Sequence, residues 1–209
     1  MFTDKHNIYR YLGLEFSLSG KFSKAKEDLS KRAMKAMFKL MSLFKPSSPR
    51  YKTLIHLFDH TIKPILTYGS EVWGATMIPS CNASIYDVTI KDVIEKCHYK
   101  YLRYAFGVNK RAPKFGVYGE TGRYTLALEC FGNCLKYFFK INDPYLSFNK
   151  LLFHCLKENE KLQQQKYNWL SNLLRVLNEN INISNLKNLR TNYILKLLKS
   201  TLQTKFRDG

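Results

Sequence analysis

The helix-breaking residues of this chain are confined to its first two-thirds. All 6 prolines, and every glycine except the final Gly209, lie at or before position 144 of the 209 residues. Proline removes a backbone hydrogen-bond donor and glycine is the most costly residue to order, so a stretch without either favours helix. We therefore expect residues 145–208 to be helical and the preceding part to be divided by turns into shorter elements.

Hydrophobic periodicity predicts helices in the first part too. Over residues 23–44 the apolar side chains recur at steps of three and four, which makes one stripe of an amphipathic helix (positions 25, 29, 33, 36, 37, 40, 41 and 44). Similar spacing predicts helices over residues 51–68, with a kink at Pro64, over 86–106 and over 124–142.

Glycine and proline positions predict how these helices are joined. Gly107 stands where a helix C-cap prefers glycine, a turn is expected between Gly69 and Gly74, and a loop is expected through Pro113 and Gly119. Loose alternation over residues 8–22 indicates a short hairpin. The expected fold class is mainly α, a multi-helix assembly with a short N-terminal β-hairpin.

The charge balance points to a polyanionic partner. Lysine and arginine number 34 against 16 acidic residues, a net charge of +18 whose self-repulsion a phosphate backbone would relieve. A hydrophobic content of 45% indicates a packed core rather than a disordered tail. An anionic membrane surface would need a basic amphipathic helix or a lipidation signal at a terminus; no such signal is found, so RNA, RNA–DNA hybrid or single-stranded DNA is the expected partner, and no membrane.

Cysteine usage bears on the compartment. The 5 cysteines are odd in number and irregularly spaced, which predicts reduced, buried thiols rather than a disulfide framework. Asp4, Lys5 and His6 stand where a signal peptide would be apolar, and no run of about 18 apolar residues occurs. The expected location is intracellular, with nucleus and cytoplasm left open.

Two basic clusters are candidate nucleic-acid contacts. The first lies on one face of the helix predicted at residues 23–44 and consists of Lys24, Lys31, Lys35 and Lys39. A solvated face is the alternative, because Glu27 and Asp28 are placed to pair with Lys31 and Arg32.

The second cluster spans residues 96–114, which contain no acid. Its cations are Lys96, Lys100, Arg103, Lys110, Arg111 and Lys114, interleaved with rings that include His98, Tyr99, Tyr101 and Tyr104. Rings beside cations suit stacking on unpaired bases. We expect Tyr101 to be in the core, and Tyr99 and Tyr104 to be the exposed rings.

Patterns for catalysis or metal binding are weak. His56, Asp59 and His60 resemble a two-histidine zinc motif but lack its glutamate and a third ligand, so structural histidines are favoured. The cysteines and histidine at 130, 134, 154 and 155 lack zinc-ribbon spacing. No carboxylate pair suited to two-metal chemistry and no phosphate-binding glycine loop is found. We therefore expect no catalytic residues, no bound metal and no cofactor.

Four short phrases follow one another along the chain. They are Tyr11-Leu12-Gly13 with Phe16, Ser19, Gly20 and Phe22; Leu57-Phe58-Asp59 with Ile62, Pro64, Ile65 and Leu66, leading to Tyr68-Gly69-Ser70-Glu71-Val72-Trp73-Gly74; Phe106-Gly107-Val108-Asn109-Lys110 with Val117-Tyr118-Gly119-Glu120-Thr121-Gly122-Arg123-Tyr124; and Asn168-Trp169-Leu170 with Leu174 and Leu177. In this order they resemble the region after the polymerase palm in non-LTR retrotransposon reverse transcriptases of the jockey and chicken-repeat type. Together the phrases span nearly the whole chain.

The resemblance implies a thumb-like helical region that holds template and growing strand, with Tyr11, Leu12 and Gly13 near the primer end. It implies a hairpin at residues 1–22, a first thumb-like helical pair at 23–80, a second helical subdomain at 81–144 and a C-terminal helical region at 145–209. In the family the catalytic aspartates, which use magnesium, precede the Tyr-Leu-Gly phrase; here only ten residues precede it. We therefore expect a fragment of an RNA-directed DNA polymerase with no polymerase activity alone.

Two other functions stay open. The chain could be a non-catalytic interaction protein whose basic surface serves an acidic protein or a palm-containing polypeptide supplied in trans. It could also be an inert remnant of a decayed element, which would fold poorly.

Overall fold

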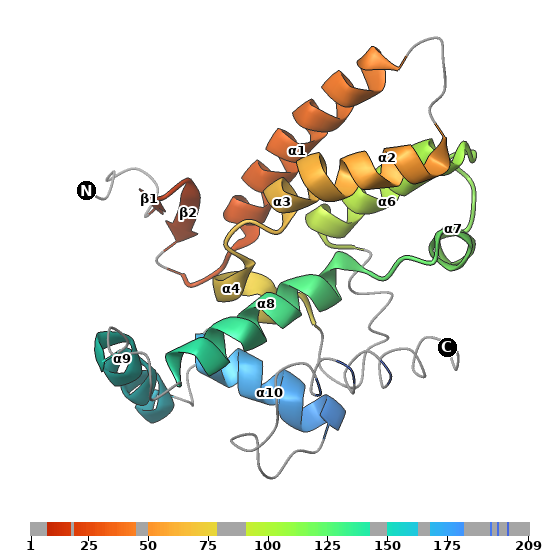
Figure 1. The fold of residues 1–209 in the computed structure, drawn as a ribbon. Coiled ribbons are helices and arrows are strands. Elements are labelled where there is room, and N and C mark those ends of the chain that lie inside the picture. The colour runs from red at the N-terminus through yellow and green to blue at the C-terminus, as the bar shows by residue number, and fades with distance from the viewer. Residues whose placement is uncertain are drawn as a thin grey trace. The chain divides into compact units, whose positions relative to one another are not determined.

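The computed structural model describes residues 8–17, 19–44, 50–78, 91–142, 150–162, 168–181, 193, 196 and 200. Helices dominate them, and a two-stranded antiparallel hairpin precedes the first helix, so the predicted mainly α class with an N-terminal hairpin is confirmed (Figure 1). None of the described helices combines the length and apolar character needed to cross a membrane.

The chain forms two compact units. The first comprises Met1–Ser17, Phe22–Tyr68 and Ile90–Leu126, and the second comprises Leu18–Lys21, Gly69–Thr89 and Ala127–Gly209. The predicted basic clusters and the Tyr-Leu-Gly phrase all fall within the first unit.

The hairpin of the first unit pairs β1 (Ile8–Tyr11) with β2 (Leu14–Ser17), with Tyr11 opposite Leu14. Leu12 and Gly13 form the turn, and both have positive φ, +46° and +82°. This is the handedness that two-residue hairpin turns require. Glycine adopts it freely, whereas leucine rarely does.

Helix α1 (Ser23–Leu43) confirms the predicted amphipathic helix to within one residue. Its buried side chains are Ala25, Leu29, Ala33 and Met37, and all four belong to the predicted stripe. The stripe packs against α6 and α3. Pro46 and Pro49, expected to end the helix, lie outside the described residues.

The helix predicted over residues 51–68 is present as three consecutive segments. They are α2 (Tyr51–Leu57), the π-helical turn η1 (Phe58–Ile62) and α3 (Lys63–Leu66). Pro64 has no N–H to donate and its ring crowds the preceding turn. The chain meets this conflict by widening into a π turn just before the proline.

The turn predicted between Gly69 and Gly74 is wrong, because this stretch is helical in α4 (Ser70–Trp73) and the 3₁₀ turn η2 (Gly74–Met77). Gly69 does break the chain direction, with φ of +66°. Gly74 instead has helical φ and allows close packing, since a Cβ there would overlap the backbone carbonyl of Cys130.

Helix α6 (Val93–Phe106) begins after Asp92, whose side chain caps it by accepting the Ile94 N–H at 2.9 Å. Residues 86–90 of the predicted helix lie outside the described residues. Its end at Gly107, with φ of +69°, is confirmed. The predicted loop through Pro113 and Gly119 is wrong. Residues there form α7 (Lys114–Thr121), which ends at a second left-handed glycine, Gly122.

The remaining described helices are α8 (Leu126–Ile141), α9 (Lys150–Lys161) and α10 (Trp169–Ile181). Apart from the start of α8 they belong to the second unit, where α10 packs against α9 and η2. The helical tail is thus confirmed where the structure describes it, except that Leu162 and Asn168 lie outside helices.

Candidate nucleic-acid interface

The first predicted basic cluster lies along the exposed face of α1. Lys24, Lys31, Lys35 and Lys39 are all exposed. From Lys31 onward they recur every four residues, which places successive ammonium groups about 6 Å apart along the helix axis. Such a row matches a linear array of phosphates better than a single anion.

The alternative interpretation is that local ion pairs neutralise this face. It applies to Arg32, a neighbour of the four lysines, and not to the lysines themselves. Asp28 accepts a hydrogen bond from Arg32 Nε at 2.9 Å and lies 3.8 Å from Arg10. The hydrogen bond from Arg32 holds the pKa of Asp28 below its usual value. No ion pair between the four lysines and a carboxylate is found in the part of the chain that the structure describes.

The second predicted cluster lies on α6 and the segment that follows it. Lys96, Lys110, Arg111 and Lys114 are exposed, whereas Lys100 and Arg103 are half-buried. The turn at residues 107–112 that carries Lys110 and Arg111 is closed by Asn109, whose backbone and side chain accept hydrogen bonds from Ala112 and Arg111.

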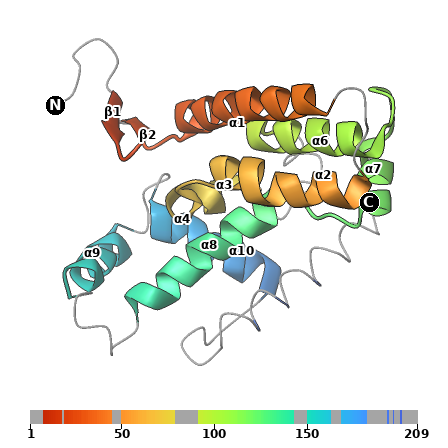
Figure 2. The same ribbon diagram turned by 45° about the horizontal axis from the view of Figure 1, so that its top comes forward.

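The two clusters adjoin each other, because α1 and α6 lie side by side and run in the same direction (Figure 2). Near their start Ser30 Oγ donates to the Val93 carbonyl at 3.3 Å. Further along, the ammonium group of Lys100 lies 4.7 Å from the centroid of the Phe38 ring. Lys100 therefore belongs to both clusters, which the sequence pattern did not reveal.

Two cations of the second cluster, Arg103 and Lys114, lie against the ring of Tyr99. The guanidinium carbon of Arg103 lies 5.1 Å and the Lys114 ammonium 5.9 Å from its centroid. Its hydroxyl donates to the Ala112 carbonyl at 2.7 Å. Tyr99 is half-buried, so it is less open than the sequence suggested, and it orders the cations and anchors the following turn.

The other predicted rings divide as follows. Tyr101 is fully buried as predicted, and its hydroxyl donates to the Leu54 carbonyl at 2.7 Å. Burial raises the pKa of Tyr101 well above its usual value. Tyr104 is half-buried and packs edge-on against Tyr101, so it is less open than the sequence suggested.

His98, which the sequence only places among the rings of the second cluster, is buried. It is 1% exposed, packs against Phe58, and places Nδ1 2.9 Å from Glu95 Oε1. Glu95, itself fully buried, also accepts hydrogen bonds from the Tyr118 hydroxyl and from the Leu126 N–H. Sequence reasoning missed Glu95, although its position seven residues before Leu102 places it beside the apolar stripe.

The Tyr-Leu-Gly phrase forms a clamped, exposed tip. Tyr11 is 54% and Leu12 70% exposed. The Leu12 carbonyl accepts a hydrogen bond from the Tyr68 hydroxyl at 2.7 Å, and the Gly13 carbonyl accepts one from Arg32 at 2.6 Å. The first unit therefore holds this tip in one conformation.

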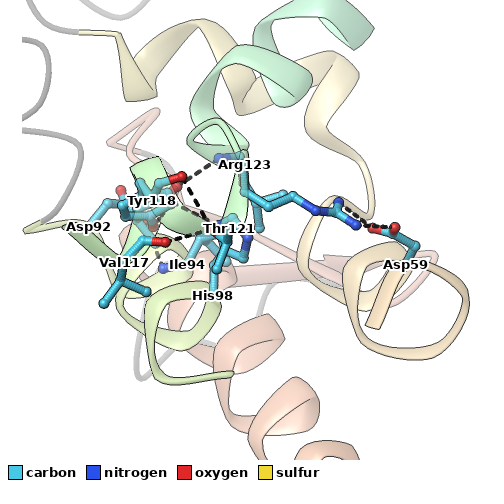
Figure 3. Close-up of polar contacts among 10 residues, drawn as sticks. Asp59, Asp92, Ile94, His98, Val117, Tyr118, Thr121 and Arg123 are labelled. Atoms are coloured by element: carbon cyan, nitrogen blue, oxygen red, sulfur yellow. Dashed lines mark hydrogen bonds and ion pairs between the residues drawn. The ribbon is translucent and has the colours of Figure 1, made fainter. Parts of the chain in front are cut away.

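The possible metal-binding patterns stay without support. Asp59 binds Arg123 through two hydrogen bonds (Figure 3). His56 and His60 are exposed, with ring centroids 4.0 Å apart. No group of three or more histidine, cysteine or acidic side chains placed to hold a metal is found among the described residues.

The cysteines follow the prediction in part. Cys97, Cys130 and Cys134 are buried thiols, and burial raises the pKa of Cys97 to about 11 and that of Cys134 to about 12. Cys155, on α9, is exposed, contrary to expectation. Cys81 lies outside the described residues.

Comparisons with known proteins give no relative: no family model matches the chain, and neither the curated proteins nor the solved structures contain a significant match.

Proposed function

We propose that this chain binds nucleic acid through the basic faces of α1 and α6, as the thumb-like part of a non-LTR retrotransposon reverse transcriptase. The observation that carries the proposal is the contact between Lys100 and Phe38, because it joins two basic clusters into one surface. With a net charge of +18, this surface favours contacts to the phosphate backbone, which give affinity with little base specificity.

Contacts among the four phrases support the assignment to that family. Tyr68 of the second phrase bonds to Leu12 of the first, and Arg123 of the third bonds to Asp59 of the second. In the second unit, Trp169 Nε1 of the fourth phrase donates to the Glu71 carbonyl of the second at 2.8 Å. The phrases that carry the resemblance therefore supply contacts within each of the two units, as expected of a shared fold.

The proposed role is to hold template and primer while another part of a polymerase performs the chemistry. No catalytic metal site is assigned to the chain. With magnesium, primer–template and nucleotides, this chain alone should therefore extend no primer. Product above a heat-inactivated control would contradict the role.

The first experiment is a salt titration of binding to a labelled RNA–DNA hybrid. Each phosphate engaged contributes about 0.7–0.9 to the slope of log K against log salt concentration. Replacing Lys96, Lys100 and Arg103 by alanine, or Lys31, Lys35 and Lys39, should reduce the slope by roughly two or more in each case. The matched control removes the same charge from exposed lysines of the second unit, Lys136, Lys150 and Lys157. Equal slopes for all three variants would contradict a specific surface.

A second function is favoured by the clamped tip. Tyr11 and Leu12 present apolar surface held in place by Arg32 and Tyr68, as a protein-contacting edge would. The partner would be a palm-containing polypeptide supplied in trans. Replacing Leu12 by asparagine should abolish co-sedimentation with such a polypeptide while leaving the salt slope on hybrid unchanged.

A further inference from the structure

Phe38 is an exposed aromatic ring on the basic face of α1. It is 51% exposed and does not belong to the apolar stripe that packs into the core. Lys31 and Lys35 stand seven and three positions before it, and Lys39 follows it directly. The offsets of seven and three place the ring on the side of the helix that carries Lys31 and Lys35, and Lys39 lies roughly 100° further around the helix.

The stretches of α1 and α6 that flank this ring carry cations and no acidic residue. Lys100 contributes its ammonium group from α6, at 4.7 Å from the ring centroid. From Leu29 to Leu43 the helix contains no acidic residue, and residues 96–114 contain none either. The negative face of a phenyl ring attracts cations, so the ring also keeps Lys100 at this surface.

Exposed apolar side chains are common in proteins, so exposure alone carries no weight. A second exposed ring, Phe153 on α9, provides the comparison, because Lys157 lies 4.9 Å from its centroid in the same manner. There, however, Glu158 and Glu160 follow within the same helix. Phe38 differs from Phe153 because the row of lysines around it on α1, from Leu29 to Leu43, contains no acidic residue.

We infer that Phe38 is a stacking platform for one unpaired base of a single-stranded nucleic acid whose phosphates are held by Lys31, Lys35, Lys39 and Lys100. The inference rests on the proposed function and narrows its ligand from nucleic acid in general to a strand with at least one unstacked base. Within a duplex both faces of each base are covered by neighbouring base pairs, so only an unpaired or splayed base reaches the ring.

The chemistry of the ring determines what it recognises. Phenylalanine has no hydrogen-bond donor or acceptor, so it reads the flat face of a base and not its edge. A base that takes the place of the Lys100 ammonium on the ring frees that ammonium for the adjoining phosphate. Binding should therefore accept every base, RNA and DNA alike, and favour purines, which offer the larger stacking surface.

The test compares Phe38→Ala with the unaltered chain on four single strands, oligoadenylate and oligouridylate and their deoxy counterparts, and on a blunt duplex. Loss of one stacked base should weaken binding to the single strands by about 5- to 150-fold. The salt slope should not change, because no cation is removed. Affinity for the blunt duplex should stay the same.

Three further variants make the result specific. Phe38→Trp should restore binding and show fluorescence that is quenched by the single strands, over the signal of the two native tryptophans. Phe38→Leu should bind as weakly as Phe38→Ala, since it keeps apolar bulk without a flat ring. Phe153→Ala on α9 should bind like the unaltered chain. Because Phe38 is exposed, all variants should melt at the temperature of the unaltered chain.

Separate readouts distinguish failure of this inference from failure of the proposed function. A steep salt slope that the α1 and α6 lysine variants reduce, together with unaltered affinity of Phe38→Ala for every single strand, would overturn the stacking role and leave the phosphate-binding surface standing. A shallow slope in the unaltered chain would overturn both. A loss confined to the RNA or to the DNA strands would overturn the expected indifference to the sugar and assign the platform to one of them.

Discussion

Arg123 donates two parallel hydrogen bonds to Asp59, from Nη1 to Oδ1 at 2.9 Å and from Nη2 to Oδ2 at 2.5 Å (Figure 3). The residues are 64 positions apart in the chain, and the pair ties the segment after α7 to the π-helical turn η1. Both side chains are about one-quarter exposed. A paired, partly buried carboxylate contributes to stability more than most surface ion pairs do.

Removing the arginine should therefore destabilise the first unit. We expect Arg123→Ala to lower the free energy of unfolding by about 1–3 kcal/mol, because Asp59 loses both hydrogen bonds from Arg123 and keeps its ion pair with Lys63, 3.5 Å away. The free energy of unfolding of Arg123→Lys should lie between those of Arg123→Ala and the unaltered chain, since lysine keeps the charge but cannot donate two parallel hydrogen bonds. Urea denaturation measures both, with the exposed Arg111→Ala as control. Equal midpoints for Arg123→Ala and Arg111→Ala would contradict the structural role.

The same pair predicts a pH dependence. Burial opposes ionisation of Asp59, yet the hydrogen bonds and charge of Arg123 hold its pKa below the usual 3.8. A pKa lower in the folded than in the unfolded state gives stability that is fully present above the unfolded value and is lost as the pH falls through the folded one. The free energy of unfolding should thus drop between about pH 5 and pH 2. In Arg123→Ala the drop should be smaller; an identical drop would show that the acid sensitivity comes from other carboxyls, such as Asp28.

The hairpin turn predicts a stabilising substitution. Leu12 has φ of +46°, a conformation that costs a leucine roughly 1 kcal/mol and that asparagine tolerates. Leu12→Asn should raise the free energy of unfolding by up to about that amount, and should reduce binding of an apolar dye. Leu43→Asn is the control, because Leu43 is similarly exposed but lies in a helix. A less stable Leu12→Asn variant would mean that contacts of the leucine side chain outweigh the backbone strain.

Two helical glycines provide a matched pair. An added Cβ at Gly74 would overlap the carbonyl of Cys130, whereas at Gly119 it meets nothing within 4 Å. Gly74→Ala should destabilise by about 1–3 kcal/mol through overpacking. Gly119→Ala should instead stabilise α7 by about 0.5–1 kcal/mol, the difference in helix propensity. Thermal melting compares the two variants, and a shift of the same sign in both would contradict the packing described for Gly74.

Local patterns predicted the elements whose determinants lie within a few residues. The stripe of α1 and the C-cap at Gly107 are of this kind, because periodicity and the need for a left-handed residue are visible in the chain itself. The sequence does not predict α7, because its glycines and Pro113 are loop signals. In the structure the proline precedes the first turn, a position that helices accept, and Gly122 ends the helix.

The candidate surface was predictable in its charges but not in its assembly. The lysines of α1 are exposed as their spacing suggested. The contact of Lys100 with Phe38 joins residues far apart in sequence, and no periodicity within either helix encodes it. The burial of His98 was not predictable for the same reason, because it depends on Phe58 and Tyr118, which come from other segments.

The pairing or burial of four acidic residues in the first unit has a kinetic consequence. Asp28, Asp59 and Asp92 are each held against a basic side chain, and Glu95 is enclosed in the core. The lysines of the α1 face are thereby left to dominate the field that reaches into the solvent. Such a field accelerates diffusional encounter with a polyanion and weakens as added salt shortens the Debye length. Nucleic-acid strands should consequently associate fast and with little selectivity. Preference for one strand over another should then come from its slower dissociation.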